Sequence, residues 1–244
     1  MTEGSPIQTQ PGEPAAALAD ATGARAFLAT VRPQIYGSGA PDKVIDPLVE
    51  PLWVGIRALA AADAAGAIIV DDEGEPVANI ETIVDAVAEA VRATGAVVDG
   101  FLTKQTIQTG VAVYQWSDES PSMGSFIGLR RNRAVDTLAL REEALQAKTF
   151  KTEDEIGFVA TDLLWLDDTS LLDVPLLERR RLLESVLVES DVVRIGTFVR
   201  PPIASWVGSW KAQGFTGLTY KAANSRYLSG AENPQWAVSG MPRR

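Results

Sequence analysis

Apolar positions recur along the chain with two periods, one typical of strands and one typical of helices. Residues 52–70 predict two strands joined by a turn at 64–66, where alanine and glycine interrupt the apolar run. Apolar side chains then recur at three- and four-residue spacing over residues 80–91, which predicts a helix. Asn79 stands at its N-cap position, and Gly95 is placed to end it as a C′ glycine.

The same patterns predict further elements on both sides of this region. An apolar strand at 158–166 is followed by a helix that Asp173 and Pro175 open. The other expected strands are residues 96–102, 110–116, 192–199, 217–221 and 236–238, and the other expected helices are residues 15–31, 133–146 and 203–213. Strands mixed with separate helices favour an α+β fold with largely antiparallel sheets.

Composition divides the chain into three parts. Residues 1–14 are polar and rich in glycine and proline, which predicts a disordered tail. Residues 15–47 form a helical and linker segment, which prolines and glycines interrupt between 33 and 41. Residues 48–244 carry the globular domain, which is long enough to bury one sizeable core.

The chain contains no cysteine and no histidine, which restricts its possible chemistry. Disulfides, thiolate or imidazole metal ligands, cysteine nucleophiles and histidine-based triads are excluded. Catalysis would rely on carboxylates, lysine, serine or tyrosine, and a bound metal would be a hard cation held by oxygen.

The formal net charge is −10, whereas proteins that grip a phosphate backbone usually carry positive charge on the binding face. Arg130, Arg131 and Arg133 form one basic cluster, which we interpret as a solvated surface stretch. The N-terminus lacks the basic and apolar regions of a signal peptide, and no apolar run reaches the length of a membrane span. We therefore expect a cytoplasmic protein.

Residues 158–187 read FVATDLLWLDDTSLLDVPLLERRRLLESVL and resemble the ATP-dependent DNA ligase family. Members of that family carry a strand of the type FDLLYLDG, a short loop, and a helix beginning LPLLERR. Here the strand reads TDLLWLDD and the helix begins VPLLERR, with the spacing from strand to helix kept. The segment is therefore a specific match in both residue types and spacing.

Three further segments resemble motifs of the same family in the same order. Residues 217–240 keep the glycine, lysine, serine, tyrosine and tryptophan positions of the EGVVAK and PDW region without a gap. Residues 50–58 resemble the nucleophile motif, which runs lysine, any residue, aspartate, glycine, any residue, arginine. Residues 97–102 are similar to ELDGEL. Together the resemblance covers about residues 48–240.

The resemblance implies the nucleotidyltransferase, or adenylation, domain of ligases: antiparallel sheets flanked by helices in an ATP-grasp-like arrangement, with a groove between the sheets. In ligases an oligonucleotide-binding fold follows the last of these motifs, and we expect no such domain here. The family's reaction is attack of a lysine amine on the α-phosphate of ATP, assisted by further lysines and a divalent cation.

The side chains that this reaction requires are replaced. Leu52 occupies the nucleophile position, and leucine has no lone pair with which to attack phosphorus. We therefore expect no catalytic residue, no metal site and no cofactor, with ATP and Mg²⁺ as the alternative. The other replaced positions are Val54, Phe101 and Thr216 for carboxylates, Thr161 for an aromatic ring, and Val238 and Gly240 for lysines.

Arg57, Asp99 and Lys221 match the family at positions that the resemblance assigns to a vestigial nucleotide cleft. By the resemblance, Arg57 and Lys221 would face the sugar and phosphate of the nucleotide. Each position also has a structural interpretation. Asp99 with Gly100 is an ordinary turn or strand-end pair, and Gly55 permits close backbone approach. The two cations sit at strand ends, paired with surface acids, or are simply inherited.

Tryptophans offer one further candidate surface. Trp206 and Trp210 lie four residues apart on one predicted helix, so they either face a partner or pack onto the domain, and packing is the commoner meaning of such a pair. Trp53 lies within a predicted strand and is expected in the core.

Three hypotheses for function follow. The first is a catalytically inactive ligase-like protein that acts as a scaffold or binding module for an unidentified protein partner. The second is a protein that binds a nucleotide non-covalently in the old ATP cleft. The third is an active nucleotidyltransferase with a displaced lysine, Lys104 or Lys43, which ranks last because the carboxylates are replaced as well. We expect no DNA binding by the chain alone and no membrane partner.

Overall fold

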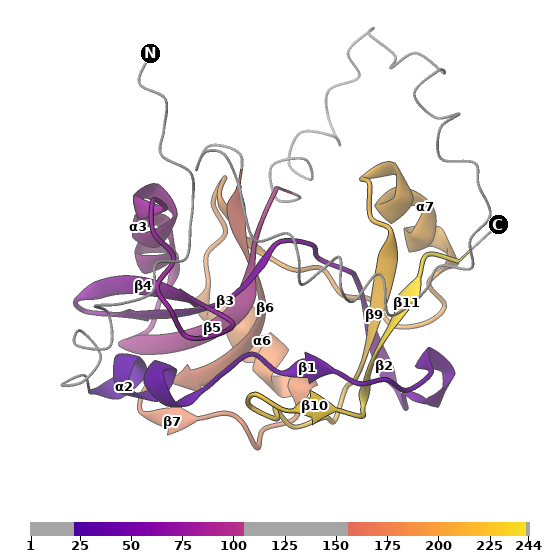
Figure 1. The fold of residues 1–244 in the computed structure, drawn as a ribbon, viewed down its shortest axis with the longest axis horizontal. Helices are drawn as coiled ribbons and strands as arrows, with labels where there is room; N and C mark the ends of the chain where they lie inside the picture. The colour runs from indigo at the N-terminus through magenta and orange to yellow at the C-terminus, as the bar shows by residue number, and fades with distance from the viewer. Residues whose placement is uncertain (1–21, 105–155, 243–244) are drawn as a thin grey trace, which may run out of the picture.

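The structure is a computed structural model that describes residues 22–104 and 156–242 of the chain. A larger and a smaller sheet stand side by side, with helices packed against them (Figure 1). This confirms the α+β fold with largely antiparallel sheets. Several sequence predictions lie outside the described residues, namely the tail at 1–14, the strand at 110–116, the helix at 133–146 and the basic cluster Arg130, Arg131 and Arg133.

The larger sheet has the strand order β4-β3-β5-β6-β7 with antiparallel neighbours, and β8 pairs with β6 in parallel. Its strands are β3 (Ile56–Asp63), β4 (Gly66–Asp71), β5 (Gly95–Thr103), β6 (Gly157–Leu166), β7 (Thr169–Ser170) and β8 (Val193–Ile195). The turn between β3 and β4 falls where the sequence predicts it.

The smaller sheet is antiparallel and has the order β11-β9-β2. Its strands are β2 (Pro47–Pro51), β9 (Gly217–Ala222) and β11 (Trp236–Gly240). A short parallel pair, β1 (Ile35–Tyr36) with β10 (Glu232–Asn233), brings the N-terminal segment beside the C-terminal one. Residues that lie about 200 positions apart in the chain therefore meet at one edge of the molecule.

Helices cover the sheets on several sides. The helices are α2 (Gly23–Thr30), α3 (Glu81–Ala90), α6 (Leu176–Val186) and α7 (Ala204–Ala212), with a 3-10 turn, η1, at Pro41–Lys43. No helix within the described residues is long and apolar enough to cross a membrane.

The larger sheet is buried on both faces, which explains its almost uniformly apolar strands. On β3, Ile56, Ala58 and Ala60 join the core cluster formed with α3 and α6, whereas Leu59 and Ala61 join the cluster formed with α2. Alternate residues of a strand point to opposite faces. Arg57 therefore lies on the face that α2 covers, together with the neighbouring side chains of β5.

Both predicted ends of α3 are wrong. Its N-cap residue is Ile80 rather than Asn79. Gly95 does not end a helix, because α3 stops at Ala90 and Gly95 opens β5. A Cβ atom at Gly95 would lie 2.9 Å from the Trp165 ring, so glycine is required here by sheet packing rather than by a helix C-cap. The strand predicted at 192–199 is also shorter, since only Val193–Ile195 pairs with β6.

Two adjacent arginines fasten α6 to β6. Arg179 donates from Nε to Asp162 Oδ1 at 2.8 Å and from Nη2 to Asp162 Oδ2 at 2.7 Å, and both side chains are fully buried. Arg180, also buried, donates from Nη1 to the Thr161 carbonyl at 2.6 Å and from Nη2 to the Gly196 carbonyl. We call these three residues, Asp162, Arg179 and Arg180, the β6–α6 junction.

Candidate functional site

Leu52, the residue at the nucleophile position, lies directly after β2 and is 1% exposed. Its amide donates to the Gly217 carbonyl at 2.9 Å, which ties it to β9. Its side chain packs with Val238 of β11 and against Tyr36. Two of the replaced positions, one from the start and one from the end of the domain, are therefore in direct apolar contact.

A cavity of about 400 Å³ opens beside Leu52, and we call it the first cavity. Three replaced positions, Leu52, Phe101 and Val238, lie on its wall together with the retained Arg57. The complete lining is Arg32, Pro33, Gln34, Ile35, Tyr36, Leu52, Arg57, Asp72, Phe101, Gly230 and Val238.

Arg57 and Asp99 form a buried pair beneath this wall. Arg57 Nη2 donates to Asp99 Oδ2, and the guanidinium carbon lies 4.5 Å from the centre of the Phe101 ring. The Tyr227 hydroxyl donates to the same Asp99 oxygen at 2.7 Å and accepts from the backbone amide of Gln34 at 2.9 Å. Asp99 thus joins β3, β5 and the two segments that meet at β1 and β10.

Burial and pairing act in opposite directions on this group. Burial raises the pKa of Asp99, and the nearby Arg57 charge and the Tyr227 hydrogen bond only partly offset that rise. Burial lowers the pKa of Arg57, but attraction to Asp99, together with Tyr36 and Tyr227, holds that pKa above its ordinary value. Burial together with the Asp99 charge raises the pKa of Tyr227 well above its ordinary value.

Three buried polar atoms of this region have no hydrogen-bond partner: Gln34 Nε2, Arg57 Nε and Asp99 Oδ1. Gln34 and Arg57 line the first cavity, and Gln34 is 3% exposed. Its other side-chain atom, Oε1, accepts from the Leu228 amide and from Asn233. Because an unpaired buried donor is costly, Gln34 Nε2 and Arg57 Nε mark where a ligand's acceptor would be stabilised, whereas Asp99 Oδ1 is an unpaired acceptor.

Lys221 lies elsewhere. Its Nζ donates to Glu50 Oε2 at 2.7 Å and sits 4.5 Å from the centre of the Trp236 ring, and its side chain is fully buried. It is not part of the lining of the first cavity. The structure therefore gives Lys221 a place in the smaller sheet, where it crosslinks β9 to β2 and β11, and the paired Glu50 was not singled out by the sequence.

Two of the replaced carboxylate positions, Val54 and Thr216, also lie away from the first cavity. Val54 offers its carbonyl to the Thr103 hydroxyl at 2.6 Å, and Thr216 is exposed just before β9. Neither lines the first cavity. Asp99 and Gly100 lie inside β5 rather than in a turn. Gly55 has the predicted role, since a Cβ atom there would lie 2.1 Å from the Leu102 carbonyl oxygen.

The described residues of the first cavity do not fit a magnesium–triphosphate group. Magnesium requires several oxygen ligands, and Asp72 is the single carboxylate in the lining of the first cavity. Within residues 22–104 and 156–242, no group of three or more acidic side chains is arranged to hold a metal ion. Of the two arginines in the lining, Arg32 and Arg57, the second is already paired with Asp99.

The N-terminal segment contributes residues that sequence reasoning missed. Gln34, Ile35 and Tyr36 line the first cavity, although they fall in a stretch interpreted as linker. The available signal was an apolar and aromatic pair, Ile35-Tyr36, within an otherwise polar, proline- and glycine-containing segment. Such residues in a linker indicate a segment that packs against the domain.

Two antiparallel sheets flanked by helices, with motif positions converging beside a cavity, define an adenylation-type domain. A family profile described as "ATP dependent DNA ligase domain" matches residues 55–237, three quarters of the chain. The chain belongs to the ATP-dependent DNA ligase family. No match was found among proteins whose functions have been curated.

Solved structures show the same fold. The ligase domain of LigD from M. tuberculosis superimposes with a TM-score of 0.53 at 20% identity, covering 85% of this chain and 58% of that one. A mycobacterial DNA ligase D complexed with ATP and MES gives a TM-score of 0.55 at 18% identity, covering 86% and 60%. The chain therefore spans about three fifths of the length of these two proteins.

Proposed function

We propose that this chain is a catalytically inactive member of the ligase family that acts as a binding module through its first cavity. One observation carries the proposal: the nucleophile position is Leu52, which is buried on the cavity wall beside Phe101 and Val238. An alkyl side chain cannot form a bond to phosphorus, so no lysyl-adenylate can form at this position.

A displaced lysine is not available in the described part of the cavity. No lysine is among the lining residues. Lys221, the lysine that matches a family motif, is already paired with Glu50. Lys43 and Lys104, the two alternatives considered from the sequence, do not line the cavity either. These placements support inactivity over a rearranged active site.

The same replacements favour a ligand that is less polar than a nucleotide. Leu52, Phe101 and Val238 present alkyl and aromatic surface, and burying such surface is worth about 25 cal/mol per Å². Gln34 Nε2 and Arg57 Nε offer unpaired donors to the same ligand. We therefore propose a ligand with an apolar body and a hydrogen-bond acceptor, presented either as a small molecule or as a side chain of a protein partner.

A non-covalent nucleotide binder is the second candidate. The observation that favours it is the position of Arg57 and the Tyr36 ring on the wall of the first cavity, where a guanidinium and an aromatic ring could contact a sugar and a base. Its weakness is the charge balance, because the Asp99 carboxylate already neutralises Arg57.

Adenylation is tested with α-labelled ATP and Mg²⁺, followed by a denaturing gel and autoradiography. We expect no labelled band from the unsubstituted protein and none from Leu52→Lys. The new amine would lack a metal site and the lysines that Val238 and Gly240 replace, and each missing electrostatic contact typically costs about 10²- to 10³-fold in rate. A labelled band that appears only with Leu52→Lys would show that the rest of the site is still competent. A labelled band from the unsubstituted protein would refute inactivity.

Ligand class is tested by thermal-shift titration. A ligand at about one hundred times its Kd stabilises a protein by roughly 2.7 kcal/mol, which moves the melting temperature measurably. A shift with ATP, ADP or AMP that Arg57→Gln abolishes would favour the nucleotide candidate. A shift with apolar compounds that carry a hydrogen-bond acceptor, abolished by Leu52→Lys, would favour an apolar ligand in the first cavity.

A further inference from the structure

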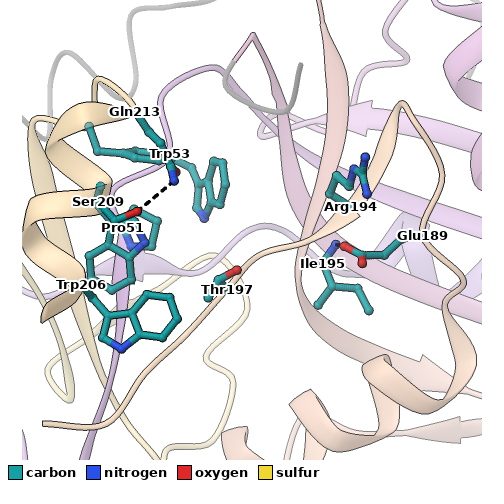
Figure 2. A pocket seen from close by; sticks show the side chains of 11 residues that line it. Pro51, Trp53, Glu189, Arg194, Ile195, Thr197, Trp206, Ser209 and Gln213 are labelled. Carbon is teal, nitrogen blue, oxygen red and sulfur yellow. Dashed lines mark hydrogen bonds between the residues drawn. The ribbon is translucent and has the colours of Figure 1, made fainter. Parts of the chain in front are cut away.

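A second cavity of about 250 Å³ lies between the end of β2, the segment around β8, and α7 (Figure 2). It shares no lining residue with the first cavity. Leu52 lines the first cavity, whereas its neighbours Pro51 and Trp53 line the second. The complete lining is Pro51, Trp53, Glu189, Arg194, Ile195, Thr197, Trp206, Ser209, Trp210, Gln213 and Phe215.

A buried indole donor faces this cavity without a partner. Trp53 is 5% exposed, and its Nε1 makes no hydrogen bond. The Phe215 ring fixes the indole by edge-on packing, with ring centres 5.0 Å apart and planes at 90°. Figure 2 shows the ring nitrogen directed toward the hollow in which Thr197 lies. Buried indole N–H groups normally find an acceptor, so this one is preformed for a ligand.

A second unpaired donor comes from the opposite wall. Arg194 Nε is buried and has no hydrogen-bond partner. Glu189 is the carboxylate in the lining, and its Oε1 accepts a hydrogen bond from the Ile195 backbone amide at 2.9 Å. Within the described ranges, no carboxylate is within ion-pairing distance of the Arg194 guanidinium. Arg194 therefore stands in the wall without an ion pair among the described residues, although Glu189 lines the same cavity.

The remaining wall is aromatic. Trp206 and Trp210 on α7 have ring centres 6.0 Å apart, and Trp206 is 43% exposed at the edge of the cavity (Figure 2). Trp210 packs inward with Trp53 and Phe215, which answers the question left by the sequence: one member of the pair is core and the other is available to a ligand. Flat rings favour a flat partner in offset or edge-on contact.

We propose that the second cavity binds a small aromatic carboxylate. Its ring lies against Trp206, and its acceptor oxygens pair with Arg194 and the Trp53 indole. A carboxylate fits better than an uncharged acceptor because hydrogen bonds to a guanidinium are strengthened when both partners are charged. A cavity of this volume holds one or two fused rings and is too small for a nucleoside triphosphate.

Indole N–H resonances in ¹H–¹⁵N NMR test this directly, since each of the six tryptophans gives one signal and Trp53→Phe identifies the signal of Trp53. The probe is 2-naphthoate, titrated into the full chain. We expect a saturable shift of the Trp53 signal. Arg194→Gln should weaken binding roughly tenfold or more, because a charge-assisted hydrogen bond is lost. Trp206→Ala should weaken it roughly three- to tenfold.

The matched control is Arg181→Gln, which removes one positive charge from the exposed face of α6 and should leave naphthoate binding unchanged. Two further titrations separate charge from shape. Equal binding of the uncharged analogue 2-naphthalenemethanol would overturn the carboxylate assignment. Equal binding of inorganic phosphate would overturn the aromatic assignment. A Trp53 signal that stays unmoved at millimolar naphthoate would overturn the site itself.

Discussion

The β6–α6 junction and the wall of the first cavity both contain motif positions of the ligase family, but they differ in how far their residues match it. Asp162, Arg179 and Arg180 match the family's residue types and are fully buried in mutual or backbone hydrogen bonds. Leu52 and Phe101 are equally buried but depart from the family, with apolar groups where the reaction needs an amine and a carboxylate.

The difference lies in what each side chain holds. Removing Arg179 would leave the Asp162 carboxylate unpaired in the core, so the fold itself retains the pair. Leu52, in contrast, holds no polar group and contributes apolar contact with Val238. The junction positions that match the family in residue type are thus ones whose side chains hold another protein group.

The largest expected effect is at the junction. Arg179→Met should lower the free energy of unfolding by about 3–5 kcal/mol, because Asp162 is left charged and without its partner in a fully buried site. Urea denaturation followed by circular dichroism measures the change.

Arg181→Gln is the control for this prediction. It lies next in sequence on α6 and pairs only with Glu178, and both side chains are at least half exposed. Such a surface pair contributes less than about 1 kcal/mol. If Arg179→Met were no more destabilising than Arg181→Gln, the junction would not explain why these motif residues are retained.

Tyr227→Phe should have an intermediate effect, since Tyr227 stands between the two regions. Its hydroxyl joins Asp99 beneath the first cavity to the Gln34 backbone, and the substitution removes both hydrogen bonds while keeping the ring. We expect a loss of about 1–3 kcal/mol in the free energy of unfolding, the usual cost of unpairing buried groups. A loss below about 0.5 kcal/mol would mean that Arg57 alone satisfies Asp99.

Leu52→Met should have a small effect on stability. The substitution conserves volume and chemistry at a site next to an open cavity, so we expect a cost below about 1.5 kcal/mol. At the junction, Arg179→Lys should lower the free energy of unfolding by more than this, although it also keeps the charge. Lysine cannot reproduce the bidentate hydrogen bonding of Arg179 to Asp162. Denaturation of both variants side by side measures this, and equal losses would remove the contrast.

Much of the fold could be predicted from the sequence because its signals are local. The apolar run at β6, the helical spacing of α3 and α6, and the glycine after α7 each act within one element. β2, β1 and β10 were not predicted, because Pro47–Pro51 carries two prolines and the other two strands have only two residues each. Their strand geometry comes from long-range pairing, which no local pattern contains.

The site could be predicted only in part for the same reason. Leu52 and Arg57, singled out by their motif positions, line the first cavity, and Asp99 pairs with Arg57. Motif order alone, however, does not say which way a side chain turns. Lys221 turns toward Glu50 because the register of β9 with β2 brings the two strands together. Gln34 reaches the first cavity because the N-terminal segment pairs with β10, a contact between distant parts of the chain.

The smallest expected effect concerns the turn after β6, where the chain also follows the family's pattern in part. Asp167 matches the family and accepts hydrogen bonds at Oδ1 from the Thr94 hydroxyl at 2.6 Å, the Thr94 amide at 2.9 Å and the Gly95 amide at 3.3 Å. The Thr94 hydroxyl is the main reason why the pKa of Asp167 lies below its ordinary value of 3.8. Like the junction residues, Asp167 therefore serves the fold, although from an exposed position.

Thr94→Val should raise the pKa of Asp167 toward 3.8 without fully restoring it, because the two backbone donors remain. A lowered pKa means that the folded state binds its proton more weakly than the unfolded state. The stabilisation is therefore complete above pH 3.8 and is lost as the pH falls through the lowered value. Wild type should exceed Thr94→Val in stability at pH 7, and the two should converge in acid. A ¹³C NMR titration of the Asp167 carboxyl carbon measures the pKa in both proteins. An unchanged pKa in Thr94→Val would show that the turn backbone alone holds Asp167, and that its match to the family reflects backbone geometry rather than this side-chain contact.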